Sequence, residues 1–274
     1  MKILAPLRGV TIRCFRETFA RPIADFGFNE AITPFITAAP GYDPLKDREL
    51  LNADRQSLTT TPQFIGKDPA ALRYCLERIK AAGYETADLN CGCPFPMVRN
   101  KGRGSGLLRT PKVLAEMLAV GCEVMGEGKF SMKTRLGVTE KDELLKLLPL
   151  INQFPLRFVT VHPRTAIQMY EGECDLAAYQ KVAAECKLPL VLNGPGGEMV
   201  GRPFIRALAD LLDIRELLDK YIENSVAELH APSPVVGRLK ELIAYWKDNP
   251  RWSRYWRIIK LARSLDELKL ALPS

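Results

Sequence analysis

Short apolar segments alternate with amphipathic helical patterns along the first 212 residues of the chain. The apolar segments have the length of buried strands, and the stretches between them place apolar residues three and four positions apart, the spacing of a helix. This alternation predicts βαβ units and a parallel sheet. Seven strands in this order predict an α/β fold, namely a (β/α)8 TIM-type barrel. The predicted strands span residues 2–6, 30–35, 62–65, 86–90, 131–136, 158–162 and 188–193, and the predicted helices include 69–82, 111–125, 141–152 and 176–186.

The strand patterns stop near residue 213, and helical periodicity continues to the end of the sequence. One apolar face there has spacings of three and four, which predicts a buried helix stripe. Its members are Val235, Val236, Leu239, Leu242, Ile243 and Trp246. We therefore predict a barrel domain over residues 1–212 and a small helical domain over residues 213–274, reached through a connector that contains the proline-rich break at 232–234.

Polar residues close four of the predicted strands. Successive side chains of a strand point to opposite faces. This alternation directs Gln63, Asn90, Lys133 and His162 to one place, with Asp88 on the face of Asn90 and Arg135 on the face of Lys133. The carboxyl ends of barrel strands carry the active sites of such enzymes. Each residue alone is best explained by a structural role, whereas the four together predict a ligand site.

Two cysteines flank Gly92 in the stretch DLNCGCPFPMVRNKGRGSG, residues 88–106. A zinc site is excluded by the lack of a second cysteine pair and by a total of two histidines. We expect Cys91 to pack outward as a small apolar residue. Cys93 follows the strand end and precedes a loop with three glycines, which favours an exposed, reactive thiol under a mobile loop. A buried structural thiol in a turn remains the alternative.

The composition of the chain bears on its cellular compartment and on its binding partners. The seven cysteines are scattered and odd in number, which predicts a reduced, cytoplasmic protein. No apolar run reaches the length of a membrane span, and the first apolar stretch is too short for a signal peptide. The net charge is +7. From residue 235 onward nine Lys and Arg residues face four acidic ones, so the basic end of the chain is suited to a polyanion.

Several motifs together resemble the tRNA-dihydrouridine synthase family in order and spacing. They lie within residues 4–194 and read APLRGVT, PQFIGKDP, ADLNCGCP with KGRGSGLLRTP, MKTRLG, VHPRT followed by Gln168 and Tyr170, and VLNG. The helical end with RLKELIAYW resembles the RNA-binding domain of that family. NCGCP is most similar to the bacterial C subgroup.

The resemblance implies a barrel that binds FMN and reduces the C5–C6 double bond of a tRNA uridine with electrons from NADPH. It implies that Cys93 protonates C5 while a hydride passes from the flavin N5 to C6, and that Asn90 holds the uracil edge. It also implies assistance from Arg135 in binding RNA or flavin. The residues implied to contact FMN are Pro6, Leu7, Arg8, Gln63, Lys133, His162, Asn193, Gly201 and Arg202.

The basic helical end has a corresponding place in the resemblance. Arg251, Arg254 and Arg257 are available for phosphates of the tRNA. The three tryptophans among them, at positions 246, 252 and 256, are better explained as the helix core. We expect a monomer with no membrane segment and no metal.

One segment departs from the family pattern. Only residues 195–197 separate Gly194 from the strand-like stretch 198–201, and Pro203 replaces a glycine expected after Arg202. A parallel crossover needs about a dozen residues, usually with a helix. The seventh helix is therefore missing, and the barrel is incomplete or irregular near strands seven and eight.

Three explanations of this deletion remain open. Either the barrel closes irregularly and keeps FMN, or the protein is a tRNA-binding relic without flavin, or the chain is a piece of a longer protein. A flavin oxidoreductase acting on a free pyrimidine is a further alternative, which the basic helical end disfavours because a small substrate does not require it.

Overall fold

A computed structural model describes residues 1–50 and 58–273. All strand pairs in it are parallel. They form one sheet in the order β10-β1-β2-β4 and another in the order β3-β5-β6-β7-β8-β9. The strands are β1 (Ile3–Leu4), β2 (Glu30–Ile32), β3 (Ile36–Thr37), β4 (Thr59–Thr61), β5 (Gln63–Ile65), β6 (Ala87–Cys91), β7 (Phe130–Gly137), β8 (Val159–Thr165), β9 (Leu190–Leu192) and β10 (Met199–Val200).

The two sheets are parts of one barrel wall. Because Pro62 has no backbone N–H for the ladder, it separates β4 from β5, and β2 continues after a short break as β3. The wall therefore has eight strand positions. All seven predicted strands are confirmed, as is the strand-like character of the segment at 198–201.

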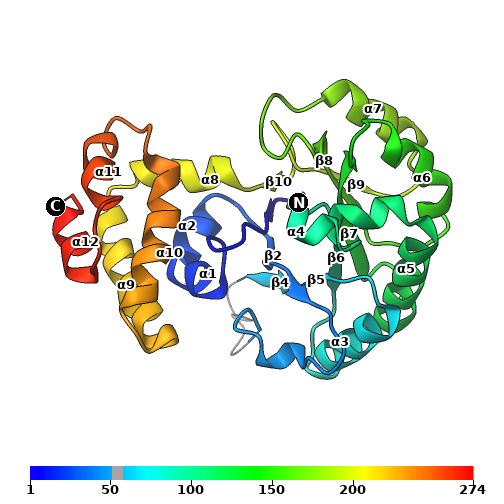
Figure 1. The fold of residues 1–274 in the computed structure, drawn as a ribbon, viewed down its shortest axis with the longest axis horizontal. Helices are drawn as coiled ribbons and strands as arrows, with labels where there is room; N and C mark the ends of the chain where they lie inside the picture. The colour runs from blue at the N-terminus through cyan, green and yellow to red at the C-terminus, as the bar shows by residue number, and fades with distance from the viewer. Residues whose placement is uncertain (51–57, 274) are drawn as a thin grey trace.

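Helices α3 (Pro69–Ala81), α5 (Pro111–Met125), α6 (Glu143–Ile151) and α7 (Leu176–Glu185) lie along the outside of the barrel (Figure 1). By contrast, α1 (Arg13–Thr18) and α2 (Ala20–Asp25) lie against the C-terminal helices, and α4 (Pro96–Arg99) belongs to the loop after β6. The start of α3 illustrates how the sequence sets them. Asp68 caps it by accepting from the N–H groups of Ala70 and Ala71, and Pro69 occupies the first turn, where no N–H is needed. The four predicted barrel helices are confirmed within a few residues at each end.

No helix lies between β9 and β10 in the described part of the chain, as the short 195–197 linker predicts. Asn193, directly after β9, donates from Nδ2 to the carbonyl oxygen of Met199 at 2.9 Å, and Glu198 accepts from the N–H of Leu192 at 2.9 Å. β10 therefore begins beside the end of β9. A six-residue connection is long enough here because β10 starts where β9 ends, and the two strands are not paired with each other among the described residues.

Helices after the barrel form a separate lobe on the left of Figure 1. They are α8 (Arg202–Ala207), α9 (Ile214–Leu229), α10 (Ser233–Ile243), α11 (Ser253–Ile259) and α12 (Leu265–Ala271). The predicted apolar face of α10 is buried throughout. Trp246 and Trp252 are fully buried and donate to the carbonyl oxygens of Ile205 and Ala209, and Trp256 packs partly buried against the same core. The tryptophans are thus confirmed as core residues.

The hydrophobic core of this lobe includes part of the barrel sequence. Phe15 and Phe19 of α1 and the α1–α2 junction stack on each other and meet the edge of Tyr221 from α9. Leu4 of β1 belongs to the same buried cluster. The division of the chain at residue 212 stays a prediction. None of the described helices is long and apolar enough to cross a membrane.

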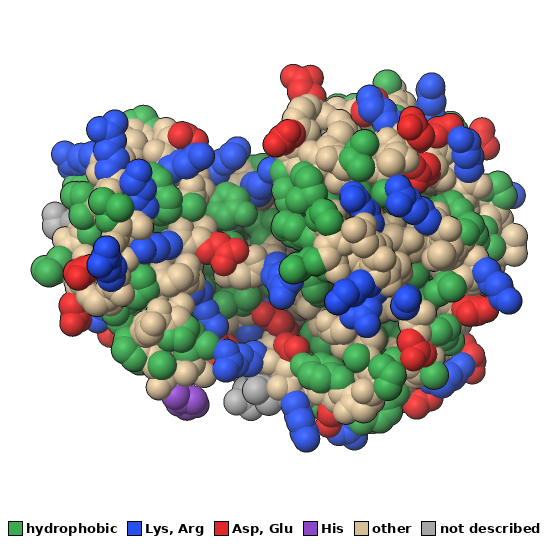
Figure 2. Space-filling view, viewed as in Figure 1, with side chains coloured by type: hydrophobic (Ala, Val, Ile, Leu, Met, Phe, Trp, Pro, Cys, Tyr) green, Lys and Arg blue, Asp and Glu red, His purple; other side chains and the backbone are tan. Residues whose placement is uncertain are grey.

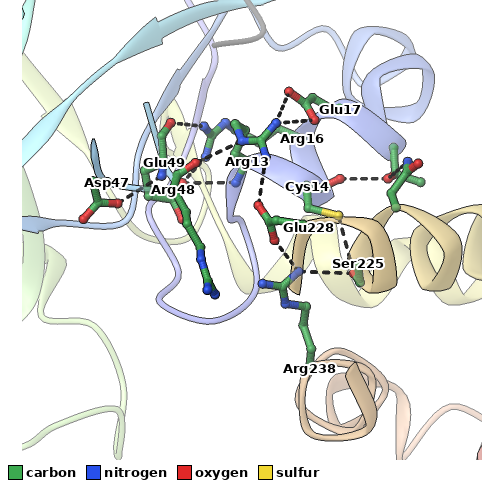
Figure 3. A network of polar contacts seen from close by, with 12 residues as sticks. Arg13, Cys14, Arg16, Glu17, Asp47, Arg48, Glu49, Ser225, Glu228 and Arg238 are labelled. Carbon is green, nitrogen blue, oxygen red and sulfur yellow. Dashed lines mark hydrogen bonds and ion pairs between the residues drawn. The ribbon is translucent and has the colours of Figure 1, made fainter. Parts of the chain in front are cut away.

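A buried ion network also joins α1 to α9 and α10 (Figure 3). Glu228 accepts from Arg13 at 3.0 Å and from Arg238 at 2.6 Å. Its side chain is 9% exposed. Arg13 also binds Glu17, whose side chain is 34% exposed. The carboxylate of Glu228 therefore neutralises two arginines that belong to different parts of the fold.

Glu228→Ala should lower the free energy of unfolding by about 2–4 kcal/mol, because it leaves two nearly buried guanidinium groups without their acceptor. Glu17→Ala is the matched control, since it removes the more exposed partner of the same Arg13 and should cost less than about 1 kcal/mol. Urea unfolding of the three proteins measures both values. Equal losses in the two variants would contradict the importance of the buried network.

Candidate active site

A chain of hydrogen-bonded amides crosses the inside of the barrel near its mouth. Gln63 of β5 donates from Nε2 to Oδ2 of Asp88 at 2.7 Å and accepts at Oε1 from Nδ2 of Asn90 at 2.8 Å. The Oδ1 atom of Asn90 then accepts from the N–H of Cys93 at 2.8 Å and of Gly92 at 3.2 Å. The structure thus brings Gln63 and Asn90 together as predicted, and it ties both to the cysteine loop.

Lys133 is on β7, where it pairs with Asn90 of the neighbouring β6 and with Thr160 of the neighbouring β8. Burial and the nearby charge of Arg135 together lower the pKa of its ammonium group from 10.5 to about 7, while Asp88 opposes the shift. Within the described residues, no acceptor binds Nζ of Lys133, and the Thr160 hydroxyl is buried without a partner. Both groups are available to a ligand.

His162 is buried and does not supply the positive charge expected of it. Burial lowers the pKa of its imidazole strongly, and Lys133, Arg135, Arg164 and Arg202 oppose protonation further. Its Nε2 contacts Nη1 of Arg164 at 2.7 Å, so a neutral ring can accept this hydrogen bond. The prediction of a cationic floor made of Lys133 and His162 is wrong for the histidine, and Arg164 provides the second charge.

The side chain of Arg135 is buried and donates hydrogen bonds to backbone carbonyl oxygens. It is 2% exposed. Its Nε donates to the carbonyl oxygen of Gly92 at 2.9 Å, and Nη1 donates to those of Thr165 and Met169 at 3.0 and 2.6 Å. Burial lowers the pKa of the guanidinium to about 10. Arg135 therefore connects the cysteine loop to the loop after β8, and direct contact with RNA or flavin stays a prediction.

The loop after β8 adds a residue that reasoning from strand ends missed. Tyr170 lies between two guanidinium groups, with Cζ of Arg135 5.3 Å and Cζ of Arg202 4.9 Å from its ring centre. The preceding Met169 has a φ of 51°, which is uncommon for a side-chain-bearing residue and typical of functional loops. In the sequence, the one pattern that pointed to Tyr170 was the motif VHPRT followed by Gln168 and Tyr170.

Cys93 is 7% exposed, so the prediction of an exposed thiol is wrong. Its carbonyl oxygen accepts from the hydroxyl of Ser105 at 2.8 Å. The Gly104 backbone has a φ of +58°, and a Cβ there would lie 2.8 Å from that of Cys93, so only glycine fits. Burial raises the pKa of the Cys93 thiol, while the N–H of Phe95 and the charge of Arg135 oppose the rise. The thiol is therefore protonated at neutral pH.

Cys91 is fully buried in the outer core, as predicted. Among the described residues, no group of three or more His, Cys, Asp or Glu side chains could hold a metal ion.

The β1 and β10 ends carry the remaining predicted cofactor contacts. Gly201 lies against the side chains of Ala5 and Leu7, so the loop holding Pro6, Leu7 and Arg8 adjoins the Gly201–Arg202 turn. Asn193 donates from Nδ2 to the carbonyl oxygen of Met199. Contact of these residues with a cofactor stays a prediction.

The helical lobe reaches the same side of the barrel. The carboxylate of Glu241, on α10, lies against Gly9 in the loop after β1. Burial raises the pKa of Tyr245, and the charge of neighbouring Arg202 opposes the rise. Figure 2 shows the surface hollowed where the two lobes meet, with Lys and Arg side chains on both sides. Arg251, Arg254 and Arg257 are exposed on the outer end of this lobe.

Residues 3–196 match the sequence profile of a family described as dihydrouridine synthase (Dus). The chain belongs to this family. It is 28% identical over 194 residues to tRNA-dihydrouridine synthase B of Vibrio cholerae, covering 70% of this chain and 59% of the relative. The same protein of Pseudomonas aeruginosa is 30% identical, covering 70% of this chain and 57% of the relative. The tRNA-dihydrouridine(16) synthase of Salmonella typhimurium is 27% identical, covering 70% and 63%.

The Dus chain thus spans less than two-thirds of the length of these relatives. Among solved structures, it resembles the old yellow enzyme homologue from Zymomonas mobilis with a TM-score of 0.54 at 13% identity, covering 75% of this chain and 85% of that one. Morphinone reductase gives a TM-score of 0.53 at 11% identity, covering 75% and 82%. At such identities the likeness concerns the fold, and it supports the TIM-type barrel.

Lys133→Met should stabilise the ligand-free protein. Folding lowers the pKa of Lys133 from 10.5 to about 7, so the unfolded chain keeps this proton to higher pH than the folded chain. The lysine therefore costs stability at neutral pH, and this cost fades as the pH rises from about 7 to about 10. We expect the variant to gain about 1–4 kcal/mol at pH 7.

Urea unfolding at several pH values measures this gain. The control variant is Lys129→Met, because Lys129 is exposed and directly precedes β7. A gain that does not shrink toward pH 10, or an equal gain in the control, would contradict the burial of the Lys133 charge.

Proposed function

We propose that this chain supplies the catalytic barrel of a tRNA-dihydrouridine synthase. It would reduce the C5–C6 double bond of a uridine in tRNA with electrons from NADPH through bound FMN. The observation that carries the proposal is that Asn90 binds the N–H of Cys93 at the end of β6 and lies beside Lys133 in the register of β6 and β7. Family membership and the printed names of the relatives support the same reaction.

The residues at the mouth fit an anionic, electron-rich cofactor. Lys133, Arg135, Arg164 and Arg202 lie near one another, as their joint influence on His162 indicates. None of the four forms a salt bridge with a carboxylate in the described part of the chain. Positive charges close together repel one another when no carboxylate lies among them, and an anion bound there offsets that repulsion.

Lys133 and Arg202 would hold FMN, together with the backbone around Gly201 and the loop at residues 6–8. When bound, reduced FMN supplies the hydride that the uracil C6 accepts. Lys133 would stabilise negative charge on the ring by regaining its own full positive charge. The buried Gln63 amide would form the bottom of the site. Its oxygen and nitrogen already bind protein partners, so one N–H of Gln63 would remain for the cofactor.

Cys93 would donate its proton to C5 of the uracil. A thiol is a proton donor only while it is protonated, and the burial that raises its pKa maintains that state. Asn90 would donate its second Nδ2 hydrogen to a uracil oxygen, since its Oδ1 already accepts from two backbone N–H groups. The uridine has to leave the folded RNA to reach this depth.

Contacts with the tRNA backbone would come from the helical lobe. Arg251, Arg254 and Arg257 are exposed, and they form no salt bridge with a carboxylate among the described residues. Exposed arginines without acidic partners are suited to phosphates. Trp252 and Trp256 support the helix from inside rather than stacking on bases.

Purified protein should carry close to one FMN per chain, identified after release by heat. Cys93→Ala should keep the flavin and lose at least about a hundredfold in dihydrouridine formation on unmodified tRNA, because general-acid catalysis contributes about 10²–10⁴-fold. Cys91→Ala is the matched control two residues away and should keep most of its activity. Absence of flavin even after addition of FMN would refute the catalytic proposal and favour an RNA-binding protein without catalysis.

Arg254→Gln combined with Arg257→Gln should weaken tRNA binding and reduce its salt dependence by about one unit of slope for each phosphate that is no longer neutralised. The control pair Lys146→Gln with Lys181→Gln changes two exposed lysines on α6 and α7, on the far side of the barrel. Binding is measured at several salt concentrations with unmodified tRNA. Equal losses in both pairs would argue for a diffuse charge effect and against a binding face on α11.

A further inference from the structure

Asp88 is the innermost group of the amide chain, and the proposed reaction gives it no part. It lies in the middle of β6 and is fully buried inside the barrel. Its Oδ2 accepts from Nε2 of Gln63, and its Oδ1 accepts from the hydroxyl of Ser131 at 2.7 Å. Burial raises its pKa to about 6, which the bonds from Ser131 and Gln63 and the charge of Lys133 oppose. The side chain is therefore mostly ionised at neutral pH.

An ionised carboxylate can only accept hydrogen bonds, whereas a side-chain amide has one end that accepts and another that donates. Asp88 therefore forces Gln63 to present its nitrogen inward and its oxygen toward Asn90. Asn90 must then present its nitrogen to Gln63 and its oxygen to the loop after β6. The orientation of both amides follows from one charge at the bottom of the chain.

The upper end of the chain is the backbone that carries the thiol. Oxygen Oδ1 of Asn90 accepts from the N–H groups of Gly92 and Cys93, while Arg135 binds the carbonyl oxygen of Gly92 from the other side. If Asn90 were reversed, its NH₂ group would face two N–H donors and no hydrogen bond could form. The position of the Cys93 thiol thus depends on the direction of the whole chain.

We propose that Asp88 is a positioning residue whose carboxylate sets the direction of the Gln63 and Asn90 amides and thereby fixes the Cys93 backbone at the barrel mouth. Its effect on catalysis rests on the proposed synthase function. Its effect on the loop does not, because the hydrogen bonds exist in the protein alone.

Asp88→Asn tests the proposal, because a neutral amide offers either end to Gln63 and the chain loses its fixed direction. The Cys93 loop should loosen, so that iodoacetamide alkylates Cys93 several-fold faster in protein without tRNA. The apparent pKa in the alkylation rate should fall toward the ordinary thiol value. Peptide mass spectrometry follows Cys93 against the partly exposed Cys122 and Cys186 of the same chain as internal references.

Ser131→Ala is the matched control. It removes the other hydrogen bond to Asp88 at the same depth and leaves the acceptor for Gln63 in place, so Cys93 should react at the wild-type rate. Gln63→Leu breaks the chain at its next link and should speed alkylation as Asp88→Asn does. In the Gln63→Leu background, Asp88→Asn should have no further effect.

Activity gives the second measurement. Misplacement of a reacting group typically costs up to about a hundredfold in rate, so Asp88→Asn should lower kcat by about tenfold to a hundredfold with little change in KM for tRNA. Unchanged Cys93 alkylation in Asp88→Asn, or additive effects with Gln63→Leu, would overturn the proposal. If the wild-type protein forms no dihydrouridine in tRNA, the synthase function alone is refuted. The alkylation result would still decide the role of Asp88.

Discussion

The hydrogen bond from Asn193 to the carbonyl oxygen of Met199 holds the start of β10 beside the end of β9. It does so across a six-residue connection where a helix is otherwise expected. The solution places β10 next to the end of β9 and pairs it with β1 on its other side. The loop after β1 and the start of α8 depend on this arrangement, because β10 pairs with β1 and Gly201 lies against the side chains of Ala5 and Leu7.

Charge at the mouth opposes stability and serves binding. Lys133 is partly buried and Asp88 is fully buried, and burial shifts the pKa of each so that the neutral form is favoured. Burial and the surrounding cations lower the pKa of His162, which favours its neutral form. A protein selected only for stability would fill this space with apolar side chains. The arrangement is understandable if the resident ligand is anionic and completes the set of charges when it binds.

Much of the fold was predictable because burial and strand alternation leave a direct record in the sequence. The face shared by Gln63, Asn90, Lys133 and His162 was inferred from parity along four strands, and these residues do converge. The missing helix before Met199 was likewise readable from loop length alone. By contrast, the exposure of Cys93 and the charge of His162 were predicted wrongly. Both depend on neighbours distant in sequence, namely Gly104 and Ser105 for the thiol and Arg135 and Arg202 for the imidazole, and no local pattern encodes those contacts.

The shared core of α1, α2 and the C-terminal helices has a mechanical meaning. Phe15 and Phe19 stack against Tyr221, and Glu228 bridges Arg13 and Arg238, so the helical lobe is built around a piece of the barrel sequence. A lobe attached in this way can swing only if these contacts break. While they hold, the distance between the barrel and the arginines of α11 is set by the fold. An RNA that touches both would present whichever nucleotide lies at that spacing, and selection among nucleotides would follow from the shape of the RNA rather than from reading its bases.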